Sequence, residues 1–253
     1  MAEMKPKNKV IIVTGASGQL GSEICKQFDE NNTVIMSDLD FELCEKKIEE
    51  LSLKNTIPLK LDVTNQDSII IAMKEVVDKF GNIDILINNA GIAVFTPMEK
   101  RTFEEFDKVM KVNVYGTFFC TQEVLKYMEL NNSGRIVNIA SHYGIVSPDP
   151  RIYGDSGRNS SEVYGASKAG IIQMTKYMAV HVKSKNITVN SVSPGGIFNN
   201  QTDSFVKNYE DKTPLQRMAT EDKIASGVVF LCSDAASYIN GHNLIIDGGF
   251  SIW

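Results

Sequence analysis

The chain has 253 residues, of which 43% are hydrophobic, and a formal net charge of -5. This length can bury one large core, and the mixed charge without a basic run argues against a nucleic-acid or anionic-membrane partner. No apolar run approaches the roughly 20 residues that cross a bilayer, and residues 1–9 lack the apolar part of a secretory signal, so we expect a cytoplasmic protein. The four cysteines are far apart, without a Cys-x-x-Cys pair, and are expected to be buried thiols.

Predicted strands and helices alternate along the whole chain. Short aliphatic runs bounded by glycine or polar residues predict strands over 9–14, 33–37, 57–61, 83–87, 135–140, 188–192 and 244–246. Helices are predicted over 19–31, 41–53, 66–80, 102–130, 164–182 and 221–233, with Thr64 or Asn65 capping the third and Gly81 ending it. This alternation predicts an α/β fold with a doubly wound parallel sheet of about seven strands. We expect a single domain over residues 1–253, because no repeat or linker divides the sequence.

A glycine-rich turn joins the first predicted strand to the first helix, with the sequence Thr14-Gly15-Ala16-Ser17-Gly18-Gln19-Leu20-Gly21. Glycines let a backbone turn sharply and approach a ligand closely, and the helix N-terminus behind them offers free N–H groups to a pyrophosphate. The turn therefore predicts a dinucleotide cradle, with an ordinary tight turn as the alternative.

Asp38 ends the second predicted strand, at the distance from the glycines where a carboxylate can accept hydrogen bonds from an adenosine ribose. The same carboxylate would repel the 2'-phosphate of NADP. No arginine or lysine stands beside Asp38 or among the glycines. NAD is therefore the favoured cofactor.

Tyr164 and Lys168 are four residues apart, so on a helix they share one face. An ammonium beside a phenol favours the phenolate and lowers its pKa, so the pair could exchange a proton with an alcohol or ketone. A solvated helix edge has the same spacing. The glycine-rich turn and Asp38 predict a site for a dinucleotide that carries a hydride, and this favours the catalytic interpretation of the pair.

Several short motifs occur in the order found in short-chain dehydrogenases/reductases. They are the 14–21 turn, Asp62-Val63, Asn88-Asn89-Ala90-Gly91, Asn113, Ser141, Tyr164 with Lys168, Pro194-Gly195 and Asp247-Gly248-Gly249. The chain resembles this family over nearly its whole length. The resemblance implies a Rossmann-type fold of three layers and an NAD-dependent enzyme that interconverts a secondary alcohol and a ketone.

The resemblance also assigns roles to residues. It implies that Tyr164 is the general acid/base, that Lys168 lowers its pKa and binds the nicotinamide ribose, and that Ser141 hydrogen-bonds the substrate oxygen. Asn113 would hold a water of a proton relay, with a packing role as the alternative. The residues implied to contact the cofactor are Gly15, Ser17, Gly18, Gln19, Leu20, Gly21, Asp38, Leu39, Asp62, Val63, Asn89, Ala90, Gly91, Tyr164, Lys168, Pro194, Gly195, Ile197 and Asn199.

Two of these positions depart from the family pattern. Gln19 stands where the commonest pattern has its middle glycine, and we expect cofactor binding to survive this change. Asn199 stands where many members have a threonine that holds the nicotinamide carboxamide, and an amide could make the same bonds.

Residues 147–161 form a polar, turn-rich loop between Ser141 and Tyr164 that is longer than in most family members. We expect an inserted substrate loop, in which Arg151 and Arg158 could bind an anion; a solvated surface loop is the alternative. Gly196 is a further predicted substrate contact. The loop and residues 193–201 are similar to oxidoreductases of bacterial surface-sugar and flagellin-modification pathways, which implies a sugar, sugar phosphate or nucleotide sugar as substrate.

Other functions stay open at this point. A 3-oxoacyl thioester reductase and a glucose or polyol dehydrogenase are the alternatives within the oxidoreductases, although acyl reductases of that kind generally prefer NADP. An epimerase or dehydratase and an NAD-sensing binding protein are alternatives of other classes. The resemblance further implies a homotetramer that uses the helices over 103–130 and 164–182 and the C-terminal residues 244–253. No metal site is predicted.

Overall fold

The computed structural model describes residues 3–154, 156, 158–183 and 186–253. Its seven-stranded sheet has the strand order β3-β2-β1-β4-β5-β6-β7, and each pair of neighbouring strands is parallel. The strands are β1 (Val10–Thr14), β2 (Thr33–Asp38), β3 (Thr56–Lys60), β4 (Ile85–Asn88), β5 (Gly134–Ile139), β6 (Ile187–Pro194) and β7 (Asn243–Ile246). The predicted Rossmann-type α/β fold is confirmed.

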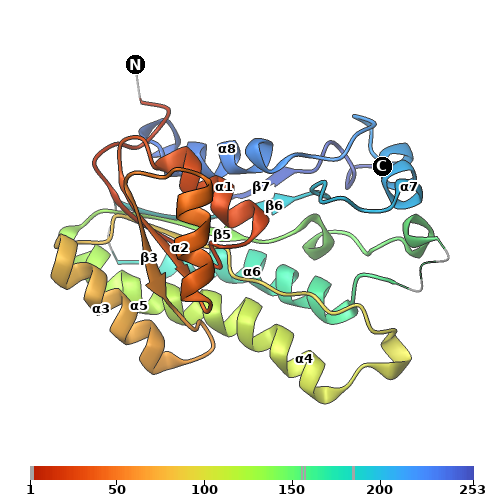
Figure 1. The fold of residues 1–253 in the computed structure, drawn as a ribbon, viewed down its shortest axis with the longest axis horizontal. Helices are drawn as coiled ribbons and strands as arrows, with labels where there is room; N and C mark the ends of the chain where they lie inside the picture. The colour runs from red at the N-terminus through yellow and green to blue at the C-terminus, as the bar shows by residue number, and fades with distance from the viewer. Residues whose placement is uncertain (1–2, 155, 157, 184–185) are drawn as a thin grey trace.

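Helices cover both faces of this sheet. They are α1 (Gln19–Phe28), α2 (Phe41–Glu50), α3 (Gln66–Phe80), α4 (Phe103–Met110), α5 (Gly116–Asn131), α6 (Glu162–His181), α7 (Asp203–Lys212) and α8 (Glu221–Cys232). Figure 1 shows α1 and α8 on one side and α3, α4 and α5 on the other. Each face has its own hydrophobic core, with α1 and α8 contributing to one and α3, α5 and α6 to the other.

Strand β1 is largely buried because its side chains are aliphatic on both faces. Ile11 and Val13 belong to the core beneath α1 and α8, whereas Ile12 between them belongs to the opposite core. Alternate residues of a strand point to opposite faces, so a continuous aliphatic run fits a sheet covered on both sides. The four cysteines are also buried, as predicted.

The ends of α3 follow the predicted capping residues. Of the two candidate N-caps it is Asn65 whose side chain accepts a hydrogen bond, from the backbone N–H of Ser68. Gly81 ends the helix with φ of 82°, in the left-handed region that glycine tolerates.

The predicted long helix over 102–130 is interrupted by a π-turn. Residues Lys111–Tyr115 form this turn between α4 and α5, and it contains Asn113, whose side chain is 0% exposed. π-turns inside helices widen the backbone and are frequent at functional sites.

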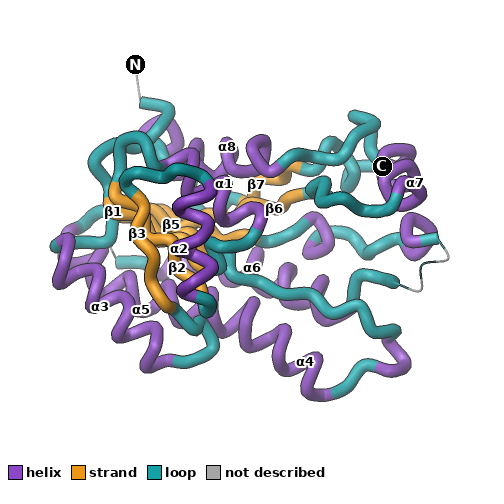
Figure 2. Tube along the Cα trace, in the orientation of Figure 1, coloured by secondary structure: helices purple, strands orange, loops and turns teal. Residues whose placement is uncertain are grey.

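Helix α7 was not predicted from the sequence. It lies near the C-terminus (Figure 2), where Phe205 and Tyr209 pack with Phe250 and with Ile152 and Tyr153 of the 147–161 loop. This third hydrophobic cluster fixes part of the loop beside the carboxyl end of the sheet. Among the described residues, no helix is both long and apolar enough to cross a membrane.

Candidate active site

The glycine turn is held by the loop that follows β4. Gly15 has φ of 59°, and a Cβ atom there would lie 2.7 Å from the Cα of Ala90. The Asn89 side-chain amide donates to the carbonyl oxygens of Thr14 and Gly15, each at 2.9 Å. Only glycine fits between these two backbones.

The N-terminus of α1 points its free N–H groups out of this turn. Its N-cap residue, Gly18, makes no side-chain capping bond, and the first turn of the helix carries no acidic residue. Gln19 donates from its side chain to the carbonyl oxygen of Phe198 at 2.7 Å. The residue that replaces the family's glycine therefore ties α1 to the segment after β6 and leaves the backbone N–H groups for an anion.

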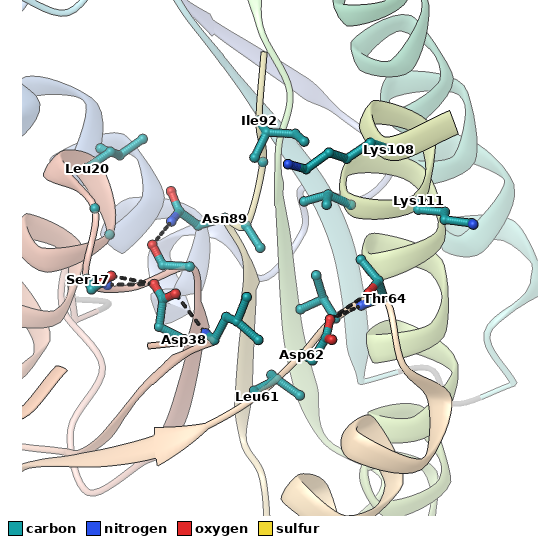
Figure 3. Close-up of a pocket in the computed structure, with 18 of the residues that line it drawn as sticks. Ser17, Leu20, Asp38, Leu61, Asp62, Thr64, Asn89, Ile92, Lys108 and Lys111 are labelled. Carbon is teal, nitrogen blue, oxygen red and sulfur yellow. Dashed lines mark hydrogen bonds between the residues drawn. The ribbon is translucent and has the colours of Figure 1, made fainter. Parts of the chain in front are cut away.

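A cavity of about 990 Å³ extends from the glycine turn to α4 (Figure 3). Asp38 lines it, and its carboxylate accepts hydrogen bonds from the backbone N–H of Ser17 at 3.1 Å and from the hydroxyl of Ser17 at 2.6 Å. Asp62 accepts from the backbone and the hydroxyl of Thr64. The cavity brings together the predicted cofactor residues Gly15, Ser17, Gly18, Gln19, Leu20, Gly21, Asp38, Leu39, Asp62, Val63, Asn89, Ala90 and Gly91.

A smaller cavity of about 330 Å³ adjoins the first and contains the predicted catalytic side chains. Ser141, Tyr164 and Lys168 line it, together with Pro194, Gly195 and Ile197. Both cavities are lined by Leu20, Asn89, Gly91 and Ile92. One elongated ligand can therefore reach from Asp38 to Tyr164.

Burial, rather than the neighbouring lysine, dominates the acid-base properties of Tyr164. We predicted a lowered pKa for this phenol, but burial raises it, and only the hydrogen bond with Ser141 acts in the opposite direction. Lys168 donates instead to the carbonyl oxygen of Ile139 at 2.8 Å, and its nitrogen lies 5.6 Å from the centre of the Tyr164 ring. Burial also lowers the pKa of Lys168, from 10.5 to about 8.

The Asn113 side chain joins α4 and α5 to the loop after β4. Its oxygen accepts from the backbone N–H of Ile92 at 2.8 Å, and its nitrogen donates to the carbonyl oxygen of Ile92 at 3.0 Å and to the hydroxyl of Ser167 at 2.9 Å. These bonds give Asn113 the packing role that the sequence left as the alternative. The proton relay stays a prediction.

Two predicted contacts in the segment after β6 lie outside the small cavity. Asn199 is exposed, and its backbone N–H donates to the side chain of Gln201. The backbone N–H of Gly196 donates to the hydroxyl of Tyr209 at 2.5 Å, and a Cβ atom at Gly196 would lie 2.8 Å from the ring of that tyrosine. Of this segment, Ile197 lines the small cavity and Asn199 does not.

The two arginines of the 147–161 loop do not line the small cavity. The Arg151 guanidinium donates to both carboxylate oxygens of Asp149, which also accepts from Lys212. The Arg158 guanidinium lies 4.2 Å from the centre of the Phe95 ring. Arg151 thus forms an ion pair within the loop, and anion binding by either arginine stays a prediction. Arg158 is exposed and packs on an aromatic face instead.

Some residues of the site were missed by the sequence analysis. The Thr14 hydroxyl accepts from the backbone N–H groups of Asn89 and Ala90. The Ser167 hydroxyl accepts from Asn113, and Tyr209 holds Gly196. Their side chains join segments distant in sequence, so no local spacing indicates them. The position of Ser167 beside Lys168 was the one available signal.

The fit of these residues to a dinucleotide is good. The glycine turn is too tight for a Cβ atom at Gly15, the α1 N-terminus lacks a capping side chain, and a carboxylate ends β2. The fold and this group of side chains define an oxidoreductase that uses a nicotinamide cofactor.

Comparisons with known proteins agree with this class. The family described as Enoyl-(Acyl carrier protein) reductase matches residues 15–251. A 3-oxoacyl-[acyl-carrier-protein] reductase FabG from Thermotoga maritima is 36% identical over 256 residues, which cover 98% of this chain and 100% of that protein. The protein of the same name from Buchnera aphidicola is 35% identical and covers 97% of this chain and 98% of its own.

Solved structures are similar over almost the whole chain. The short chain dehydrogenase from Leptospira borgpetersenii, solved with bound NAD+, has a TM-score of 0.87 and 40% identity, and covers 98% of this chain and 94% of its own. The structure of gox2181 has a TM-score of 0.91 and 30% identity, and covers 99% of this chain and 98% of its own. The chain belongs to the short-chain dehydrogenase/reductase family.

Proposed function

We propose that this protein is an NAD-dependent dehydrogenase/reductase that interconverts a secondary alcohol and a ketone on a small hydroxylated substrate. The observation that carries the proposal is the meeting of Ser141, Tyr164 and Lys168 in a cavity that adjoins the dinucleotide cradle. An acid-base group beside a hydride carrier is the arrangement that alcohol oxidation needs.

Bound NAD would accept or supply the hydride, and the protein residues would handle the proton. Tyr164 is protonated at neutral pH because burial raises its pKa, so it can donate a proton to a ketone oxygen during reduction. In the reverse direction Tyr164 must first lose its own proton to solvent, and the resulting phenolate then takes the proton of the alcohol. The Ser141 hydroxyl hydrogen-bonds Tyr164 and would hold the same substrate oxygen. Lys168 would position the cofactor beside them.

Asp38 supports NAD over NADP. Its carboxylate is held by Ser17 at the end of β2, and a 2'-phosphate at the ribose would approach this charge. The similar Leptospira borgpetersenii structure was solved with NAD+. We expect at least a tenfold preference, or about 1.4 kcal/mol.

Hydroxyl side chains near the small cavity support the proposal that the substrate is a sugar or sugar derivative of the kind found in surface glycans. The hydroxyls of Tyr143 and Tyr153 lie 3.5 Å apart, and Tyr153 comes from the 147–161 loop. A neighbouring recess is lined by Ser147, Asn159, Ser160 and Ser161. Such groups would hydrogen-bond substrate hydroxyls.

A second candidate, a 3-oxoacyl thioester reductase, is favoured by the names of the relatives. An NADH and NADPH assay at 340 nm separates the two candidates. It would compare acetoacetyl thioesters with a panel of sugars, sugar phosphates, nucleotide sugars and polyols. Faster turnover of the thioester with NADPH would overturn the sugar proposal, and faster turnover of a hydroxylated substrate with NAD or NADH supports it.

Arg158→Ala tests the loop within the same assay, with Arg151→Ala as the matched control because Asp149 already binds Arg151. If Arg158 binds an anionic sugar, only its replacement raises KM, with kcat less affected. Equal KM values in both variants and the wild type would remove the loop arginines from substrate binding.

We further propose a homotetramer. Exposed apolar side chains on α5 and α6, namely Phe118, Tyr177 and Val180, and Ile252 and Trp253 at the C-terminus, would be covered by neighbouring subunits. Light scattering at micromolar concentration should give a mass of four times 28.0 kDa. A mass of one subunit would contradict this assembly.

A further inference from the structure

The wall of the large cavity opposite the glycine turn is formed by α4 and the π-turn after it. Figure 3 shows Ser17 and Leu20 on one side of the cavity and Lys108 and Lys111 on the other. The side chain of Lys108 points into the cavity, whereas that of Lys111 points away from it. The two lysines are three residues apart and carry the same charge, but they face different surroundings.

The two ammonium groups also differ in their partners. Lys111 forms an ion pair with Asp107 at 2.7 Å. Among the ion pairs and side-chain hydrogen bonds found in the described parts of the chain, none involves the Lys108 ammonium, and the residue is exposed. An ammonium without a carboxylate partner in a cavity wall is available to an anionic ligand.

The other charged groups of the cavity do not neutralise the Lys108 ammonium or fully balance the charge of a bound pyrophosphate. In the part of the chain that the structure describes, four carboxylates line the cavity. Asp38 and Asp62 accept hydrogen bonds from Ser17 and Thr64, Asp107 pairs with Lys111, and Glu104 forms no ion pair with Lys108 among the described residues. The pyrophosphate of a dinucleotide carries two negative charges. The α1 N-terminus offers it only the partial positive charge of a helix end, about half an elementary charge.

We infer that Lys108 binds the pyrophosphate of the dinucleotide from the wall opposite the glycine turn. The inference rests on the proposed NAD binding. The glycine turn then supplies directed N–H groups on one side of the phosphates, and Lys108 supplies a full positive charge on the other. Lys108 does not line the small cavity with Tyr164, so its effect should fall on cofactor affinity and not on the chemical step.

Calorimetric titration of Lys108→Gln with NAD, ADP and adenosine tests this role. At low salt we expect the Kd for NAD and for ADP to rise about threefold to fivefold, which is the size of a solvent-exposed charge contact. The Kd for adenosine, which has no phosphate, should stay unchanged. The loss should shrink at high salt because mobile ions screen exposed charges.

Two matched variants control for net charge and helix stability. Lys111→Gln removes the same charge from the same wall and should leave the Kd for NAD within twofold of the wild-type value. Lys108→Arg keeps the charge and should restore binding. Equal loss in Lys108→Gln for adenosine and for NAD, or wild-type affinity for NAD in that variant, would overturn the inference. Failure of the wild-type protein to bind NAD would instead overturn the proposed function.

Discussion

Replacement of Lys168 by methionine tests the charge that the candidate active site buries. Lys168 is 3% exposed, and burial lowers the pKa of its ammonium from 10.5 to about 8. One pKa unit corresponds to about 1.4 kcal/mol, so this charge costs the folded protein about 3 kcal/mol at neutral pH. Methionine has a similar length and no charge, but it loses the bond to Ile139, worth about 1 to 2 kcal/mol. We expect Lys168→Met to raise the free energy of unfolding by about 1 to 2 kcal/mol while turnover is lost.

The pH dependence gives this prediction a definite sign. The folded-state pKa of Lys168 lies below the unfolded-state value, so the unfolded chain binds more protons between about pH 8 and pH 10.5. The cost of the buried ammonium is therefore complete below pH 8, and the stability gained from deprotonation grows as the pH rises through that window. Lys168→Met lacks this titration. Its advantage should shrink above pH 8 and reverse by about pH 10.

Urea unfolding followed by circular dichroism is the assay, without dinucleotide and at equal protein concentration. Lys176→Met, at an exposed position of the same helix, is the matched control and should show neither the gain nor the pH dependence. A difference between Lys168→Met and wild type that is constant from neutral pH to about pH 10 would refute the reasoning. So would a variant that is less stable than wild type at neutral pH.

Three further changes have expected outcomes. Tyr164→Phe removes one oxygen, so kcat should fall about 100-fold or more with the Kd for NAD unchanged; an active variant would contradict the acid-base role. Asp38→Ala should reduce the preference for NAD over NADP, measured by calorimetry with both dinucleotides, and an unaltered ratio would count against the carboxylate as its source. Asn113→Ala removes three hydrogen bonds of a buried side chain, two to Ile92 and one to Ser167, and should lower the free energy of unfolding by about 3 kcal/mol in urea titrations. A loss below about 1 kcal/mol would show that these bonds contribute little to stability.

The sequence pattern predicted two kinds of element: strands that need only apolar surroundings on both faces, and helix ends whose capping residues are neighbours in sequence. The aliphatic residues of β1 and β4 would be buried in any sheet that helices cover on both faces. The N-cap Asn65 and the C-terminal Gly81 of α3 depend only on neighbouring residues. The predicted strand ends were wrong by one or two residues, because the hydrogen bonds that define a strand end are made with the neighbouring strand. Helix α7 was missed because its stability comes from Tyr209 and other aromatic side chains of distant segments.

The same division holds for the candidate site. The sequence alone determined the order of its motifs, the pairing of Tyr164 with Lys168 on one helical face and the carboxylate of Asp38 at the end of β2, because each depends on spacing within one element. Only the tertiary structure decided where their polar groups are directed. Lys168 donates to the carbonyl oxygen of Ile139, and Asp149, the partner of Arg151, also accepts from Lys212 of α7. A buried or charged group takes the best partner within reach, and that partner is set by the packing of distant segments.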